Sequence, residues 1–149
     1  LHVDHFDNVG AEIYERMVVV AEDFAKRTGR NYRTTNNLIP VGANDALKKT
    51  LDLYASADLV LTSRLHGCII ALAMGRRVLA VSGDHKVESF MNAAGLGEWV
   101  CDLEEMKEFS NRLDALPGQR IPADFMERSR GQNRAVALQV RALLAKGQT

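Results

Sequence analysis

Two short, almost wholly apolar runs constrain the fold of this chain more than any other feature of its sequence. Residues 59–62 (Leu-Val-Leu-Thr) and 78–81 (Val-Leu-Ala-Val) are too short for helices and lack the polar alternation of a strand with one solvated face. Such runs are typical of strands that are buried on both faces of a parallel sheet. Between them, an apolar segment predicts a helix over 67–74 that stops at Gly75. The pattern of strand, helix and strand predicts an α/β fold.

Helical periodicity and turn residues place the remaining elements. Apolar residues recur every three or four positions from Val9 to Thr28, and Gly29 is a good helix stop. Further helices are predicted over 44–57, 86–94, 103–113 and 122–146, and short strands over 1–7, 31–40 and 99–101. Their alternation predicts a doubly wound, Rossmann-like parallel sheet. We expect the apolar helix stripes to pack in the core, including the last one, which contains Val136, Val140, Leu143 and Leu144.

Composition limits the classes of function. The 149 residues, 46% of them hydrophobic, fit a single domain over 1–149. Nineteen basic and nineteen acidic residues give no net charge, so we expect no nucleic-acid partner. No apolar run reaches the ~20 residues that span a bilayer. Cys68 and Cys101 are predicted to be reduced core residues, which favours a cytoplasmic location. The chain begins with Leu1 and not with Met, which suggests processing or an excised fragment.

Several common sites have no support in this sequence. There is no Gly-x-Gly-x-x-Gly, no Walker sequence and no Gly-x-Ser-x-Gly elbow, which disfavours a dinucleotide fold, a P-loop and a serine hydrolase. Cys68 lies in an apolar helix, where burial raises a thiol pKa and lowers its reactivity. Four N-terminal residues could ligate a metal, but clustering at a chain end is a weak signal, and no metal is predicted: His2, Asp4, His5 and Asp7.

The candidate site is Ser63-Arg64-Leu65-His66-Gly67, which stands between the first buried strand and the apolar helix. In an open α/β sheet, ligands bind at the carboxyl ends of the strands. If the stretch stays extended, Arg64 and His66 point to one side and Leu65 to the other. Gly67 would let a ligand approach the first amides of the helix, which favour an anion.

A second cation follows the next strand. Lys86 stands near the start of a helix, where the helix dipole disfavours a cation, and Asp84 is the expected cap. Since neighbouring parallel strands end at one edge, His66 and Lys86 could face the same crevice. A bland interpretation remains open, in which Arg64 forms a surface ion pair, His66 caps its helix and Lys86 is solvated.

These residues are similar to a known family. The chain resembles the C-terminal half of the polysaccharide pyruvyl transferases in a series of consecutive motifs. These are the Ser63 to Gly67 stretch, the apolar helix, Gly75, the following strand, Asp84-x-Lys86-x-x-x-Phe90 and Gly95-Leu96-Gly97. The resemblance covers about residues 55–101. It implies that the chain is the C-terminal domain of a two-domain enzyme with a glycosyltransferase-B type fold. Such an enzyme uses phosphoenolpyruvate to form a ketal-linked pyruvate on a sugar and releases phosphate, with no cofactor.

The resemblance also implies roles for individual residues. His66 and Lys86 would hold the phosphoenolpyruvate anion, with His66 as the catalytic proton donor, a task that suits a side chain with an ordinary pKa of ~6.5. Lys86 would stabilise the departing phosphate. Geometry suggests Arg64 as a bidentate partner for the carboxylate, and Ser63 and Gly67 complete the substrate-binding set. Arg76-Arg77 departs from the family pattern, in which a proline often enters this strand.

The resemblance leaves part of an enzyme unaccounted for. The family's acceptor-binding half normally precedes this one, so we expect a missing N-terminal domain, an acceptor that is a saccharide or a lipid-linked saccharide, and no activity from this half alone. Two alternatives remain. One is a nucleotide-sugar-binding domain of a glycosyltransferase-B enzyme, and the other is a non-catalytic, anion-sensing domain.

Overall fold

A five-stranded, all-parallel sheet forms the centre of the computed structural model, which describes residues 1–4, 9–37, 44–82, 84–103 and 108–146. The strand order is β2-β1-β3-β4-β5. The strands are β1 (His2–Val3), β2 (Thr34–Thr35), β3 (Leu59–Thr62), β4 (Arg77–Ser82) and β5 (Val100–Asp102). The central strands β3 and β4 are buried almost throughout, as their apolar sequences predict.

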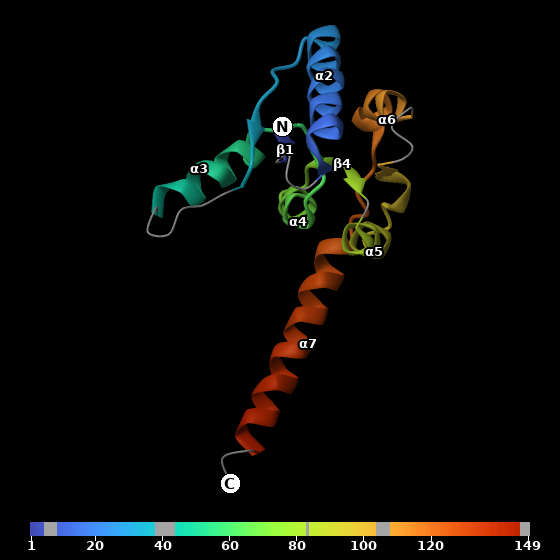
Figure 1. Ribbon diagram of the computed structural model, residues 1–149. Helices are drawn as coiled ribbons and strands as arrows, with labels where there is room; N and C mark the ends of the chain where they lie inside the picture. Colours follow the sequence, from blue (N-terminus) through green and yellow to red (C-terminus); the bar gives the residue numbers. More distant parts are fainter. Residues whose placement is uncertain (5–8, 38–43, 83, 104–107, 147–149) are drawn as a thin grey trace.

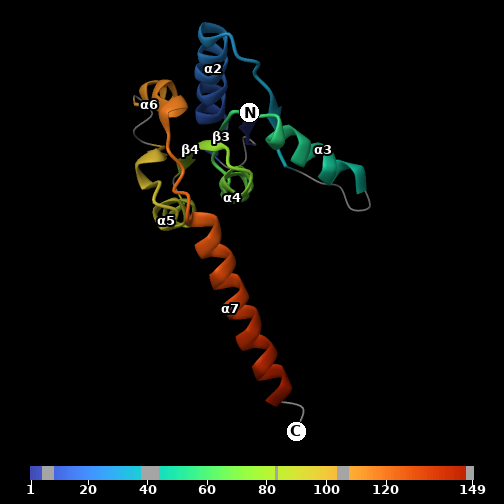
Figure 2. The same ribbon diagram turned by 180° about the vertical axis from the view of Figure 1, so that it is seen from behind.

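Helices cover both faces of this sheet. The α-helices of the described chain are α2 (Ala11–Thr28), α3 (Asn44–Ala55), α4 (Leu65–Ala73), α5 (His85–Ala93), α6 (Phe109–Ala115) and α7 (Phe125–Lys146). Met17 of α2 and Phe109 of α6 share one buried cluster with the sheet, whereas Tyr54 of α3, Cys68 of α4 and Met91 of α5 belong to the other. Figures 1 and 2 show the sheet lying between α2 and α6 on one side and α4 and α5 on the other. The predicted doubly wound parallel sheet is confirmed.

The order of the strands creates a switch point between β1 and β3. The chain leaves β1 for β2 on one side and then returns to place β3 on the other side of β1. Ligands of doubly wound sheets bind in the crevice that opens at such a point. Val3 pairs in register with Thr62, so the residues that follow the two strands, Asp4 and Ser63, emerge next to each other.

Most element ends follow the sequence signals. The helix α2 stops at Gly29, whose left-handed backbone (φ 66°) favours glycine. Three predicted starts are wrong by two residues or more in these helices: α4 begins at Leu65 and not at 67, α6 at Phe109 and not at 103, and α7 at Phe125 and not at 122. Predicted strand residues 5–7 and 38–40 lie outside the described residues.

The prediction that the last apolar stripe packs in the core is also wrong for the side chains that are described. Val136 and Val140 of α7 are 58% and 49% exposed. The helix is anchored at its start, where Phe125 packs edge-on against Phe90 of α5, and it then runs away from the sheet (Figure 1). Helical periodicity therefore predicted the helix correctly, but it did not predict whether the apolar side chains of the helix are buried.

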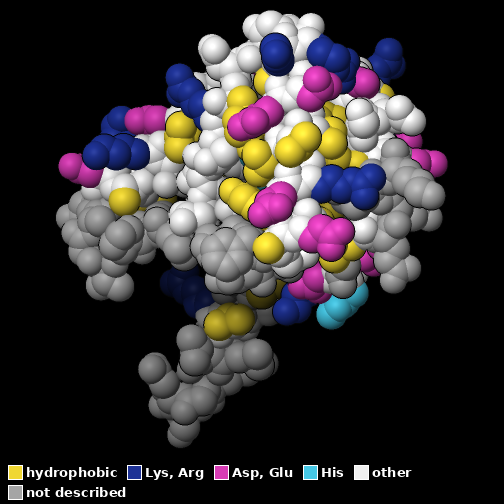
Figure 3. Space-filling model, turned by 45° about the horizontal axis from the view of Figure 1, so that its top comes forward, with side chains coloured by type: hydrophobic (Ala, Val, Ile, Leu, Met, Phe, Trp, Pro, Cys, Tyr) yellow, Lys and Arg dark blue, Asp and Glu magenta, His cyan; other side chains and the backbone are white. Residues whose placement is uncertain are grey.

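The surface and the cysteines agree with the composition. Basic and acidic side chains are interspersed on the face shown in Figure 3, and Arg27 of α2, for example, binds both Asp23 and Asp114. Cys68 and Cys101 are buried and unbridged, as predicted. Within the described part of the chain, no helix combines the length and the apolarity that a membrane crossing requires.

Candidate functional site

A cavity of about 740 Å³ opens at the carboxyl edge of the sheet, beside the switch point. Ser63 and Arg64 line it from the connection between β3 and α4, and His66 lines it from the first turn of α4. Ser82 and Asp84 line it from the connection between β4 and α5, and α3 supplies an apolar wall. Three of the predicted site residues therefore share one cavity.

The side chain of Thr62 shapes the turn from β3 into α4. Its hydroxyl donates to the carbonyl of Val3 (2.7 Å) and accepts the amide of Arg64 (3.0 Å). Arg64 is extended (φ −100°, ψ 131°), and the helix begins at the next residue. The first helical bond runs from the Cys68 amide to the Arg64 carbonyl (3.1 Å), so the amides of Leu65, His66 and Gly67 precede it.

This early start corrects the predicted geometry of the stretch. Ser63 to His66 is not one extended segment, because Leu65 and His66 already lie in the first turn of α4. Leu65 does not point away from Arg64 and His66 to the far side, since all three line the same cavity. His66 is exposed. Arg64 and His66 therefore meet through a helix start and not through strand alternation.

Gly67 has a packing role that the sequence did not reveal. A Cβ at this position would lie 2.3 Å from Oγ1 of Thr62, far closer than non-bonded atoms approach. Gly67 is buried against this side chain, which itself holds the turn. The glycine therefore lets α4 begin directly over the end of β3; its predicted contact with a ligand stays a prediction.

Arg64 is held at one end of its guanidinium group. Its Nη1 donates to the carbonyl of Asn36 (2.7 Å), and its Nε is buried with no hydrogen-bond partner among the described residues. A buried N–H without an acceptor is costly, so a ligand that supplied an oxygen would satisfy it. The surface ion pair of the alternative interpretation is not found for Arg64 within the described ranges.

Asp4 is a site residue that sequence analysis missed. It follows β1 directly, is only 5% exposed, and its carboxylate accepts both the amide (2.8 Å) and the hydroxyl (2.6 Å) of Ser63. The sequence suggested only a metal-ligating role for Asp4. The predicted strand over 1–7 placed Asp4 inside the strand, whereas β1 ends at Val3, so that Asp4 follows it at the carboxyl edge, where ligands bind.

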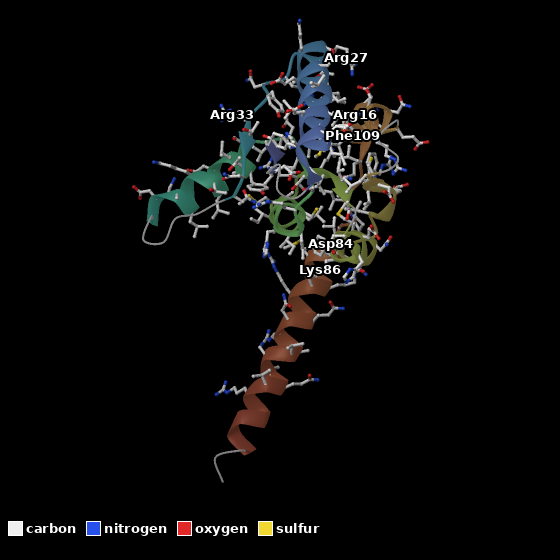
Figure 4. The ribbon with its side chains drawn as sticks, viewed as in Figure 1. Arg16, Arg27, Arg33, Asp84, Lys86 and Phe109 are labelled. Atoms are coloured by element: carbon white, nitrogen blue, oxygen red, sulfur yellow. The ribbon has the colours of Figure 1, made fainter. Side chains whose placement is uncertain are left out.

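Asp84 and Lys86 organise the connection between β4 and α5. The Asp84 carboxylate accepts the Lys86 amide (2.9 Å), which confirms the predicted cap of α5. Ser82 Oγ donates to the Asp84 carbonyl and accepts the Asp84 amide. Lys86 is exposed in the first turn of α5, next to Asp84 (Figure 4), and it does not line the cavity. The structure thus brings Lys86 to the correct edge of the sheet but not to the cavity wall.

The N-terminal residues that could ligate a metal are only partly described. His2 Nε2 lies 3.9 Å from Asp4 Oδ2, and both side chains are buried. Burial lowers the pKa of His2 to about 4, which keeps the imidazole neutral at neutral pH. His5 and Asp7 lie outside the described residues, and the described part of the chain holds no group of three or more metal-ligating side chains.

A second cavity, of about 500 Å³, lies at the opposite edge of the sheet, where β1 and β3 begin. Arg30, Arg33 and Asp58 are its charged lining residues, and Arg30 pairs with Asp58 at 3.0 Å. In doubly wound sheets the carboxyl edge carries the ligand site. The cavity at Ser63, Arg64 and His66 is therefore the candidate functional site.

Comparison with known proteins bears on the same region. The family model described as "Polysaccharide pyruvyl transferase" matches residues 3–85, which is more than half of the chain. No curated protein and no solved structure matches. The matched range runs from β1 to the start of α5, so it contains Asp4, Ser63, Arg64 and His66, and it ends one residue before Lys86.

Proposed function

Because the chain belongs to the polysaccharide pyruvyl transferase family, we propose that it forms the phosphoenolpyruvate-binding domain of a pyruvyl transferase. The enzyme would transfer the pyruvyl group to two hydroxyls of a saccharide or lipid-linked saccharide and release phosphate. The observation that carries the proposal is the meeting of Arg64, His66 and the start of α4 at one cavity on the carboxyl edge of the sheet. This arrangement offers the Arg64 guanidinium, the His66 imidazole and the first amides of α4 to an anion.

The donor carries two anionic groups, and the proposed site has a partner for each. The guanidinium group of Arg64 is suited to the carboxylate, since it can form two parallel hydrogen bonds. The helix amides before Cys68, including that of Gly67, together with His66 and Lys86 would then hold the phosphate. Lys86 reaches the phosphate only if its exposed, flexible side chain folds over the rim beside Asp84.

The proposed reaction begins with protonation of the phosphoenolpyruvate methylene by His66, which makes the adjacent carbon electrophilic. One sugar hydroxyl oxygen bonds to this carbon, the carbon–oxygen bond to phosphate breaks, and the second sugar hydroxyl closes the ketal. Of the two hydroxyl protons, one replaces the proton that His66 gave to the methylene, and the other leaves with phosphate. Lys86 would stabilise the charge on the departing phosphate.

The domain would act with a second one. We propose a glycosyltransferase-B type arrangement in which an N-terminal domain binds the acceptor and faces the cavity beside Ser63. The doubly wound sheet and the position of the cavity at its carboxyl edge are compatible with this arrangement. In this arrangement the isolated domain binds phosphoenolpyruvate but does not catalyse the transfer.

Calorimetric titration with phosphoenolpyruvate tests the proposal. Wild-type protein should bind it, and His66→Ala and Lys86→Ala should each weaken binding about tenfold. His85→Ala and Lys26→Ala are matched controls, because both residues are exposed, neither lines the cavity, and the proposed site gives neither of them a role. These two variants should bind like the wild type.

The outcomes separate the alternatives. Binding of a nucleotide sugar in preference to phosphoenolpyruvate would replace the proposal with a glycosyltransferase donor site. Unchanged phosphoenolpyruvate binding in both His66→Ala and Lys86→Ala would overturn the site. Phosphate release by the full-length enzyme, given phosphoenolpyruvate and a polysaccharide acceptor, would exclude a purely anion-sensing role.

A further inference from the structure

The hydroxyl group of Ser63 has its only proton committed to Asp4. The Oγ of Ser63 lies 2.6 Å from Oδ1 of Asp4, which is within the range of a hydroxyl bound to a charged carboxylate. The other carboxylate oxygen, Oδ2, accepts the Ser63 amide at 2.8 Å. A serine hydroxyl has one donor and two acceptor positions. Its remaining capacity is therefore that of an acceptor.

Ser63 donates two hydrogen bonds to the buried side chain of Asp4. His2 Nε2 lies 3.9 Å from Asp4 Oδ2, and its imidazole is neutral at neutral pH because burial lowers its pKa to about 4. A buried carboxylate needs hydrogen-bond donors. Ser63 supplies two of them, its amide and its hydroxyl, so turning the hydroxyl proton toward the cavity would remove one donor from a buried charge.

Ser63 also lines the cavity, between β3 and the start of α4. An oxygen that only accepts hydrogen bonds, placed above a buried carboxylate, repels a phosphate or carboxylate ligand. It attracts a group that donates a hydrogen bond, and a sugar hydroxyl is such a group. Arg64, the next residue, has the opposite preference, since a guanidinium only donates.

We propose that Ser63 binds a hydroxyl group of the acceptor saccharide as a hydrogen-bond acceptor, with Asp4 as the positioning residue that fixes the direction of its proton. This inference rests on the proposed function, and it divides the site. Arg64 and the helix amides of α4 face the anionic donor, and Ser63 faces the acceptor hydroxyl that attacks it. The switch point between β1 and β3 would thus be where donor and acceptor meet.

Calorimetry with phosphoenolpyruvate tests the direction of the proton. Ser63→Ala should bind within twofold of the wild type, because the lost hydroxyl gave nothing to the anion. Asp4→Asn should bind severalfold more tightly: the asparagine amide donates to Ser63 Oγ, which frees the serine proton for the cavity, and a negative charge disappears. The double variant Asp4→Asn/Ser63→Ala should bind phosphoenolpyruvate less tightly than Asp4→Asn, because it lacks the serine proton that contributes to the higher affinity. Thermal unfolding verifies that each variant is folded.

Steady-state kinetics of the full-length enzyme test the acceptor. Ser63→Ala should raise the KM for the saccharide about tenfold and leave the KM for phosphoenolpyruvate unchanged, a split that a merely structural role would not produce. A tenfold loss of phosphoenolpyruvate affinity in Ser63→Ala would overturn this inference and leave the proposed function standing. Failure of the wild-type protein to bind phosphoenolpyruvate would overturn both.

Discussion

Thr62 and Gly67 share one space at the start of α4: a Cβ on Gly67 would lie 2.3 Å from Thr62 Oγ1 and 3.0 Å from its Cβ. Thr62 cannot simply move aside. Its hydroxyl joins the Val3 carbonyl to the Arg64 amide and so ties β1, β3 and α4 together. The contact between Gly67 and Thr62 therefore also affects the candidate site, because Arg64 lies between Thr62 and the start of α4.

Gly67→Ala should therefore destabilise the protein. Inserting a methyl group into a packed region costs about 1–3 kcal/mol of unfolding free energy, and urea unfolding measures it. Gly131→Ala is the matched control, since Gly131 also lies in a helix and a Cβ there meets nothing within 4 Å. That variant should be neutral or more stable by up to ~1 kcal/mol. If both variants lose equal stability, the steric explanation is wrong.

The sequence predicted the elements whose signals are local. The apolar runs of β3 and β4 predicted buried parallel strands, Gly29 predicted the end of α2, and Asp84 predicted the cap of α5. Each signal depends on a residue's own chemistry and its near neighbours. The family resemblance, drawn from residues 55–101, agrees with the matched range of 3–85 in the region that they share.

The features that were missed depend on side-chain hydrogen bonds or on contacts between residues that are distant in sequence. The early start of α4 depends on Thr62 folding back onto the Arg64 amide, which periodicity cannot reveal. Asp4 and Ser63 meet across 59 residues of sequence, and only the pairing of β1 with β3 brings them together. The exposure of Val136 reflects the absence of a packing partner for that part of α7 in the described structure, a property that no helix stripe encodes.

His2 should make stability depend on pH. Burial in the folded protein lowers its pKa from about 6.5 to about 4. Between pH ~6.5 and 4 the His2 imidazole is therefore protonated in the unfolded chain and mostly neutral in the folded chain. The free energy of unfolding therefore keeps its full value above pH ~6.5 and decreases as the pH falls toward 4. At pH 5 the decrease is about 2 kcal/mol. Urea unfolding at pH 7.5 and 5 measures it. His2→Gln should reduce the difference, and the exposed control His85→Gln should not; equal pH dependence in all three proteins would contradict the assignment.

Cys68 should be unreactive in the folded protein. Burial raises its pKa to about 12, so almost no thiolate exists at neutral pH, and the side chain is fully buried in α4. Alkylation with iodoacetamide at pH 7.5, followed by mass spectrometry, should modify this thiol more than a hundredfold more slowly in buffer than in urea. Rapid native alkylation of Cys68 would show that α4 opens or that the thiol serves in chemistry.

Arg64→Lys should separate donor binding from folding. The guanidinium donates from Nη1 to the Asn36 carbonyl (2.7 Å), and its buried Nε, which has no partner among the described residues, donates to a ligand oxygen in the proposed site. A lysine carries one compact ammonium group and cannot make both contacts in this geometry. Phosphoenolpyruvate affinity should fall about tenfold by calorimetry, while the unfolding free energy changes by less than about 1 kcal/mol. Arg30→Lys, in the cavity at the opposite edge, is the matched control and should bind like the wild type. Wild-type affinity in Arg64→Lys would remove Arg64 from the donor site and return it to a structural role at the β3–α4 turn.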